Sequence, residues 1–379
     1  MKRILILGGG FGGLATAHAL RRLRPDDEVI VVDRASHFMV GFRKTWLLLG
    51  EQEESEGVRP LTAITRFGIR HRAGTVTKID PANRAAEVDG ERIEADALVV
   101  ALGAQLAPEE IPGLAEYGHN IYDPRAIPQA RAALESFGGG HLAVGVFGTA
   151  YKCPPAPYEI ALLTKAWLAA RNVPTTVEVF TPLPMSLPIL GDAGCNVIEG
   201  RLAEKGIAFV PAHVATAVTE NAVHFGDKQR PFDLLLAIPP HRCPQVVVES
   251  GLTGDRAWVP VNPQTLETDF PGVYAIGDVA EILMANGKPL PKAGVFAEAQ
   301  GEVVAQQVAA GFAGKPSDAA FAGDGGCFLE VGGGQALMVE GGFMAQPFPQ
   351  VRLTEPSADY LQQKVDFEEK RLNEWFGEG

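Results

Sequence analysis

Residues 3–23 read RILILGGGFGGLATAHALRRL, an aliphatic run that passes through Gly8, Gly10 and Gly13 into a helical pattern. Glycines at this spacing permit a tight turn and let a pyrophosphate approach the backbone at a helix N-terminus. The next aliphatic run, DEVIVVDR (27–34), ends in Asp33 and Arg34, about 20 residues after the turn, where a carboxylate accepts hydrogen bonds from ribose hydroxyls. This strand–turn–helix–strand unit predicts a dinucleotide-binding domain.

Two later segments also join a buried strand to a glycine turn. DALVVALGA (96–104) turns at Ala101 and Gly103, and PGVYAIGDVAEI (271–282) turns at Gly277 and Asp278. Their order predicts an α/β protein with two Rossmann-like dinucleotide-binding domains, the first of them split by the second. The expected boundaries are 1–108 and 250–312 for the split domain, 109–249 for the inserted one, and 313–379 for a small C-terminal region of strands and one helix.

Composition and charge narrow the function classes. The 379 residues carry a formal net charge of −13 without a basic cluster, which argues against nucleic-acid binding. No apolar run approaches the roughly 18 residues of a membrane span, and ILIL near the N-terminus is too short for a signal peptide. We therefore expect a cytoplasmic protein. The four cysteines form no CxxC and no cluster with histidine, so we expect no metal site.

The inserted domain carries an altered glycine loop. GTAYKCPPAPYE (148–159) follows the strand HLAVGVF and holds Cys153 and three prolines after its first glycine. Prolines lack the N–H donors that would bind a pyrophosphate, and the matching strand TVEVFTP (176–182) ends without an acid. Both losses predict that nicotinamide does not bind. Because Cys153 precedes a helix, the helix dipole would favour its thiolate, although an inert buried thiol explains the pattern equally well.

Taken together, these motifs resemble the glutathione-reductase-like flavoproteins of the pyridine nucleotide–disulfide oxidoreductase superfamily. Cys153 with PPAPYE, together with AIPPHR (237–242) and PLPKAGVFAEAQG (289–301), is similar to the sulfide:quinone oxidoreductases and flavocytochrome c sulfide dehydrogenases. The resemblance implies FAD as cofactor, held by these residues: Gly8, Gly10, Gly13, Asp33, Arg34, Ala101, Gly103, Gly277, Asp278, Lys292 and Gly294. RASHFMVGFRKTWLLLG (34–50) lacks the cysteine of the covalent-flavin members, so FAD should be non-covalent.

The resemblance also implies a chemistry. Cys153 would pair with Cys327, in GGCFLEVGGG, as a redox-active disulfide or sulfur-bridged pair that oxidises sulfide, or a larger persulfide, to sulfur or polysulfide. Electrons would pass through FAD to a quinone or a cytochrome. Glu159 would either shuttle protons or complement the helix dipole. Lys292 would lie near the flavin; the alternative is that Lys292 is an ordinary solvated lysine on the surface.

Other assignments stay open. An NAD(P)H-dependent dehydrogenase or ferredoxin reductase, or a redox-sensing module without catalysis, would share this fold. The terminal helix (357–377) carries Leu361, Val365, Leu372 and Phe376 on one stripe and an excess of acids, which favours docking on its own protein or a dimer partner over anionic lipid. Peripheral membrane contact and a homodimer are not excluded. Four histidines and two cysteines show no pattern and are expected to be structural or exposed: His37, His141, His213, His241, Cys195 and Cys243.

Overall fold

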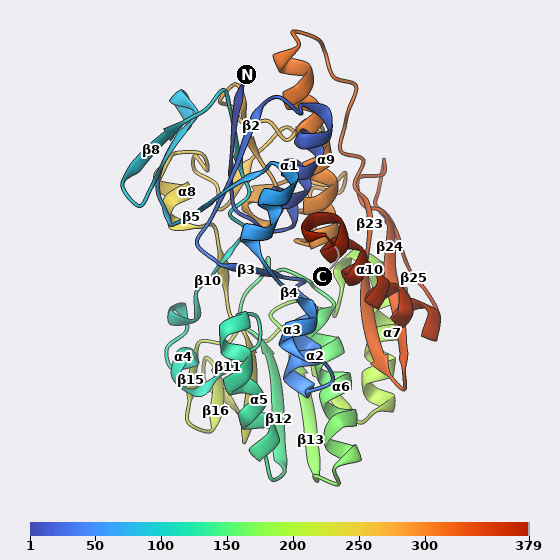
Figure 1. Ribbon diagram of the computed structural model, residues 1–379. Helices are drawn as coiled ribbons and strands as arrows, with labels where there is room; N and C mark the ends of the chain where they lie inside the picture. Colours follow the sequence, from blue (N-terminus) through green and yellow to red (C-terminus); the bar gives the residue numbers. More distant parts are fainter. Residues whose placement is uncertain (378–379) are drawn as a thin grey trace.

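The computed structural model describes residues 1–377 and contains two five-stranded parallel sheets (Figure 1). The first has the order β21-β9-β1-β2-β5. Its strands are β1 (Arg3–Leu7), β2 (Glu28–Asp33), β5 (Arg70–Ala73), β9 (Ala97–Val100) and β21 (Val273–Ala275). Strands β1, β2, β9 and β21 are apolar apart from residues at their ends, as expected for a parallel sheet that is covered on both faces, whereas the edge strand β5 (RHRA) is largely polar.

The two faces of this sheet pack against different elements. Helices α1 (Phe11–Leu23) and α9 (Gly294–Phe312) pack side by side on one face, over residues such as Ile4 and Ile6. The opposite face, with Leu5 and Leu7, packs against β6 (Val76–Asp80), β7 (Ala85–Val88) and α8 (Gln245–Glu249). Alternate residues therefore enter separate cores, as the period of two in a strand requires.

The second sheet has the order β11-β18-β12-β13-β14 and is also parallel. Its strands are β11 (His119–Asn120), β12 (Gly140–Val146), β13 (Thr175–Phe180), β14 (Ile207–Val210) and β18 (Leu234–Ile238). Helices α5 (Ile127–Ser136), α6 (Ala156–Ala170) and α7 (Gly191–Glu204) accompany it, and the antiparallel strands β15 (Ala217–Thr219), β16 (Ala222–Phe225) and β17 (Lys228–Pro231) form a small sheet beside it. The predicted α/β class with two Rossmann-like units is confirmed.

Of the remaining elements, the C-terminal strands and helix lie beside the place where the two sheets meet (Figure 1). The antiparallel strands β23 (Asp324–Gly332), β24 (Gln335–Gly342) and β25 (Gln350–Leu353) form the C-terminal sheet, and β23 packs along α6. The other segments are α2 (Arg43–Leu49), α3 (Glu54–Gly57), β3 (His37–Met39), β4 (Val58–Pro60), β8 (Glu91–Glu94), β10 (Gln105–Leu106), β19 (His241–Arg242), β20 (Val259–Pro260), β22 (Ala280–Glu281) and α4 (Leu114–Tyr117). The strands predicted within residues 313–379 are β23, β24 and β25.

The terminal helix α10 (Ala358–Phe376) packs on its own chain, against β24 and β23. Leu372 and Phe376 are buried as predicted, but Leu361 and Val365 are half-exposed. The buried face instead carries the charged residues Lys364 and Glu368, because each has a buried partner of opposite charge on another element. Within residues 1–377, none of the helices combines the length and the apolar character needed to cross a bilayer.

Candidate active site

Four strands of the first sheet end at one edge. Leu7 lies beside Val32 and Val100, and Val100 lies beside Ala275. In a parallel sheet, the loops that leave the carboxyl ends form the ligand-binding edge. The residues brought to this edge are Gly8, Gly10, Asp33, Ala101, Gly103, Gly277 and Asp278.

The glycines at this edge have two different roles. A Cβ on Gly8 would lie 2.2 Å from the carbonyl oxygen of Ala101, and a Cβ on Gly13 would lie 1.8 Å from that of Gly8. These two glycines allow strand and helix to pack closely. At Gly10, the N-cap of α1, and at Gly103, no atom lies within 4 Å of a Cβ position. That open space at a helix N-terminus suits the phosphates of a dinucleotide.

The acid at the end of β2 is fixed by the turn itself. Asp33 accepts a hydrogen bond from the Gly9 amide at 2.6 Å and another from the Ala35 amide at 2.7 Å. The carboxylate is therefore held beside the glycine turn, where it could accept hydrogen bonds from ribose hydroxyls. Arg34 is exposed next to it.

Lys292 lies on the segment that leads into α9. Its ammonium group donates to the carbonyl oxygen of Asp278 at 2.5 Å and lies 3.5 Å from the ring centroid of Trp258. Burial lowers the pKa of Lys292 to about 8. Lys292 is half-buried by these contacts, so the alternative of ordinary surface solvation does not hold. Nearby, buried Gln300 accepts from the Gly277 amide at 2.7 Å, a contact that the sequence did not predict.

Gly294 is the first residue of α9. A Cβ at this position would lie 3.1 Å from the ring of Phe11 in α1. The glycine therefore lets the two helix N-termini approach each other at the ligand edge.

Cys153 lies on the loop between β12 and α6. Its amide donates to the carbonyl oxygen of Lys292 at 2.8 Å, and its carbonyl oxygen accepts from the Tyr122 hydroxyl at 3.2 Å. Cys153 and Ala150 both have positive φ, +54° and +61°, a conformation that costs a non-glycine residue about 1–2 kcal/mol. The loop is thus held in a strained form beside the α9 segment.

Cys327 lies in β23, opposite Val339 of β24. Three residues further on, the Glu330 amide donates to the carboxylate of Glu159 in α6 at 2.9 Å. Both thiols are free. Burial raises the pKa of Cys327, and the charge of the Cys153 thiolate raises it further.

The predicted activation of Cys153 by the helix dipole is wrong for this structure. Burial raises its pKa to about 11, and the Glu159 carboxylate adds to the shift against the opposing charges of Lys44 and Lys364. The helix begins only at Ala156, whose amide already bonds the Cys153 carbonyl oxygen at 3.0 Å. Desolvation therefore outweighs the helix terminus.

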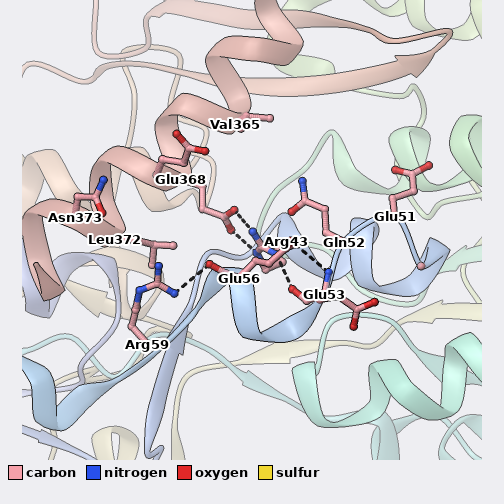
Figure 2. A pocket seen from close by; sticks show the side chains of 12 residues that line it. Arg43, Glu51, Gln52, Glu53, Glu56, Arg59, Val365, Glu368, Leu372 and Asn373 are labelled. Atoms are coloured by element: carbon pink, nitrogen blue, oxygen red, sulfur yellow. Dashed lines mark hydrogen bonds and ion pairs between the residues drawn. The ribbon is translucent and has the colours of Figure 1, made fainter. Parts of the chain in front are cut away.

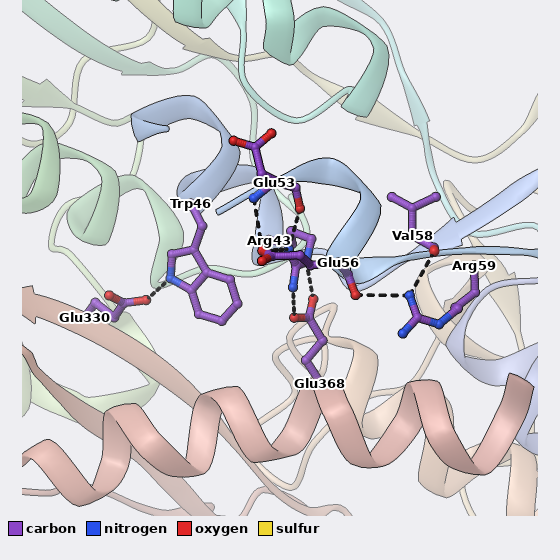
Figure 3. A network of polar contacts seen from close by, with 8 residues as sticks. All are labelled: Arg43, Trp46, Glu53, Glu56, Val58, Arg59, Glu330 and Glu368. Atoms are coloured by element: carbon purple, nitrogen blue, oxygen red, sulfur yellow. Dashed lines mark hydrogen bonds and ion pairs between the residues drawn. The ribbon is translucent and has the colours of Figure 1, made fainter. Parts of the chain in front are cut away.

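Glu159 takes part in a buried ion network. The sequence predicted that Glu159 would either shuttle protons or complement the helix dipole, and neither prediction describes this network. The Glu159 oxygens lie 3.0 and 3.1 Å from Nζ of Lys364, which also binds Glu330 at 2.6 Å. The Trp46 indole donates to the same Glu330 oxygen at 2.7 Å (Figure 3). Burial raises the pKa of Glu159. The network joins α2, α6, β23 and α10.

A cavity of about 540 Å³ lies between α10 and the α2–α3 segment (Figure 2). Arg43 reaches across and binds Glu368 at 2.8 and 2.5 Å (Figure 3). Most of the lining is charged: Arg43, Glu51, Glu53, Glu56, Arg59, Glu368 and Glu369, with Gln52, Asn373, Val365, Leu372 and Gly50. Such a lining does not suit an apolar ring.

The other two cysteines lie apart from this arrangement. Cys195 is buried in α7 and donates to the carbonyl oxygen of Leu187 at 3.1 Å. Cys243 lies in the core beneath the first sheet, where burial raises its pKa to about 11. In the part of the chain that the structure describes, no three side chains of His, Cys, Asp or Glu gather as metal ligands would.

Two parallel sheets, a complete dinucleotide edge on the first and a cysteine loop on the second, define an oxidoreductase of the two-Rossmann class. The model of the family described as pyridine nucleotide-disulphide oxidoreductase matches residues 2–301. The chain belongs to this family, which implies a flavin cofactor, and the open space at Gly10 and Gly103 fits one.

Individual relatives are distant but match over most of their length. The chain is 24% identical to the mitochondrial sulfide:quinone oxidoreductase of Mus musculus over 364 residues, which covers 91% of this chain and 79% of the relative. It is 25% identical to a demethylphylloquinone reductase of Synechocystis over 332 residues, covering 83% and 80%. The solved sulfide:quinone oxidoreductase of Aquifex aeolicus shares the fold, with a TM-score of 0.89, 22% identity, and coverage of 99% and 92%.

Proposed function

We propose that this protein oxidises sulfide and passes the electrons through a non-covalently bound FAD to a quinone. The observation that carries the proposal is the packing of β23, which holds Cys327, along α6, which follows the Cys153 loop: the Glu330 amide bonds Glu159 at 2.9 Å, and the charge of Cys153 raises the pKa of Cys327. The proposed flavin-binding domain comprises residues 1–108 and 250–312, with 109–249 inserted and 313–379 supplying Cys327. Non-covalent binding is supported by the lack of cysteine in residues 34–50.

The quinone is supported by the relatives. Both relatives described above carry a quinone in their names, but only the first also names a donor, sulfide. The donor therefore has to be argued from the cysteines of this chain. Two free thiols on separate elements, beside a loop whose prolines and missing acid argue against a nicotinamide, favour a sulfur donor over NAD(P)H.

The chemistry balances as a thiol–disulfide exchange. Hydrosulfide attacks one sulfur of the oxidised Cys153–Cys327 pair, so that a substrate–cysteine S–S bond forms, the disulfide breaks and the other cysteine leaves as a thiolate. A second hydrosulfide attacks the persulfide and releases HSS⁻, while its proton stays on the first cysteine. The flavin, when bound, takes two electrons from the reduced pair and delivers them to the quinone.

The test is an anaerobic stopped-flow measurement of flavin bleaching by sulfide. Wild type should bleach, and Cys153→Ser and Cys327→Ser should each bleach at least ~100-fold more slowly, because a lone cysteine cannot form the attacked disulfide. Cys195→Ser, which changes a buried thiol on α7, is the matched control and should behave as wild type. Bleaching by NADH but not by sulfide would replace the proposal with an NADH-dependent reductase.

A further inference from the structure

Three neighbouring strands of the second sheet also end at one edge. In the register of β11, β18 and β12, Asn120 lies beside Ala237, and Val146 lies beside Ile238. Tyr122 follows the first of these strands, His241 follows the second, and the Cys153 loop follows the third. Because the loops at the carboxyl ends of parallel strands share one crevice, these residues meet.

Direct contacts hold His241 beside the cysteine loop. The rings of Tyr122 and His241 meet edge to face, with centroids 5.6 Å apart and an angle of 88° between planes. The Tyr122 hydroxyl in turn donates to the Cys153 carbonyl oxygen. At the start of the loop, a Cβ on Gly148 would lie 3.0 Å from the Cα of Pro240. The loop and the His241 strand are therefore packed together.

The hydrogen bonds of His241 fix its tautomer. Its Nδ1 lies 2.9 Å from the carbonyl oxygen of Pro239, and a carbonyl can only accept, so Nδ1 carries the hydrogen and Nε2 carries the lone pair. His241 is 1% exposed, and its Nε2 has no hydrogen-bond partner among residues 1–377. An unpaired buried acceptor costs about 1–3 kcal/mol, which indicates that a ligand completes it.

Positive charge surrounds this acceptor. The pKa of His241 is lowered to about 3, first by burial and then by the charges of Lys152, Lys292 and Lys44, so the imidazole is neutral. Lys44, in the first turn of α2, donates to the Gly41 carbonyl oxygen at 2.6 Å, and its own pKa is lowered to about 7 by burial and by Lys152, against the charges of Cys153, Asp123 and Asp278. Lys152 forms a parallel β-bridge with Lys292. An anion with one hydrogen to donate would satisfy both the cations and Nε2.

We propose that Lys44, Lys152 and His241 form the binding site for the hydrosulfide anion beside Cys153. The two ammonium groups hold its charge, and Nε2 of His241 accepts its S–H. Chloride and other anions without a hydrogen would leave Nε2 unpaired, so His241 makes the site selective. This proposal rests on the proposed function and names the residues that bind its substrate.

The experiment measures binding without electron transfer. Hydrosulfide is titrated calorimetrically at pH 7, where Lys44, whose pKa is about 7, still carries charge, into anaerobic holoenzyme whose flavin has been photoreduced beforehand. Wild type should bind, and His241→Phe and Lys44→Met should each weaken binding about tenfold, in line with the loss of one hydrogen bond to a charged group. His241→Gln keeps an acceptor and should lose less. His213→Phe is the control, since His213 has the same Nδ1 contact to a proline carbonyl oxygen, at 2.7 Å to Pro211, but follows β14.

Each outcome decides one proposal. Absence of binding to wild type, or binding by His241→Phe as tight as that of wild type, overturns the site. Lys44→Met comes from another element, so it tests the site even where a substitution at His241 prevents folding. Mixing sulfide with the oxidised wild type tests the function separately. If that flavin stays oxidised while reduced protein binds hydrosulfide through His241 and Lys44, the function fails and the site stands.

Discussion

Replacing Lys364 by methionine tests how the terminal helix is held. Its ammonium group binds Glu159 at 3.0 Å and Glu330 at 2.6 Å, and the three residues are 1%, 2% and 6% exposed. Removing one side of a buried ion pair typically costs about 3–5 kcal/mol, because the partner stays buried and unpaired. Since two carboxylates lose their counterion here, we expect Lys364→Met to lower the free energy of unfolding at pH 8 by about 4 kcal/mol.

The measurement is urea denaturation followed by tryptophan fluorescence, because the Trp46 indole bonds Glu330 and reports on the network. Lys370→Met is the matched control on the same helix. Its side chain is 65% exposed, and its ammonium group lies 3.8 Å from Glu374. An exposed i,i+4 pair contributes roughly 0.3–0.5 kcal/mol, so the control should be nearly silent.

The pH dependence gives a second, signed test. Burial raises the pKa of Glu159 above its usual 4.5, and Lys364 opposes that rise. Without the lysine the pKa rises further, so between pH 4.5 and the raised pKa the folded state binds more protons than the unfolded state, and stability falls as pH rises. The loss in free energy of unfolding caused by Lys364→Met should therefore be smaller at pH 5 than at pH 8. Adding Glu159→Gln to this variant should raise its free energy of unfolding by about 1–3 kcal/mol at pH 8. A loss equal to that of Lys370→Met, or one larger at pH 5, would refute this reasoning.

Three further predictions concern other parts of the chain. Arg43→Met leaves Glu368 buried without its guanidinium and should lower the urea-derived free energy of unfolding by about 3–5 kcal/mol. Burial lowers the pKa of His18 from 6.5 to about 4, so the unfolded chain takes up its proton first as pH falls; His18→Leu should remove about 2 kcal/mol of the stability lost between pH 7 and pH 5 in urea titrations. Gly13→Ala places a Cβ 1.8 Å from the Gly8 carbonyl oxygen and should lower Tm of the apoprotein. Gly10→Ala, which meets no atom within 4 Å, should leave that Tm unchanged while flavin is lost on gel filtration.

The sequence predicted the first dinucleotide edge well because its determinants are local. Gly8 and Gly13 contact each other across one turn, and Asp33 bonds the amide of Gly9 in the same turn. Each later motif also ends a buried strand. Once the strands are parallel and in register, their ends must meet at one edge, so a list of strand-end motifs is already a description of the site.

The charges around Cys153 could not be predicted in this way. The expectation of a lowered pKa used the helix dipole, which the sequence shows, but burial and Glu159 prevail, and they depend on tertiary packing. The sequence predicts that His241 is structural or exposed, yet His241 follows the buried strand β18 just as Gly277 and Asp278 follow β21. Applying the strand-end rule to the second sheet would have found it. Lys44 had no such signal, because α2 brings it from another part of the chain.

The thiols of the proposed pair stand on elements with no local connection, so their spacing depends on what joins β23 to α6. Polar contacts connect these two elements. The Glu330 amide donates to the Glu159 carboxylate, and Lys364 binds the carboxylates of Glu159 and Glu330. Apolar packing tolerates sliding and substitution, whereas charge-assisted hydrogen bonds fix distance and direction together. A buried ion network adds little net stability over an apolar core, so we infer that its role here is to fix the register of β23 along α6. That register would decide whether Cys327 faces Cys153.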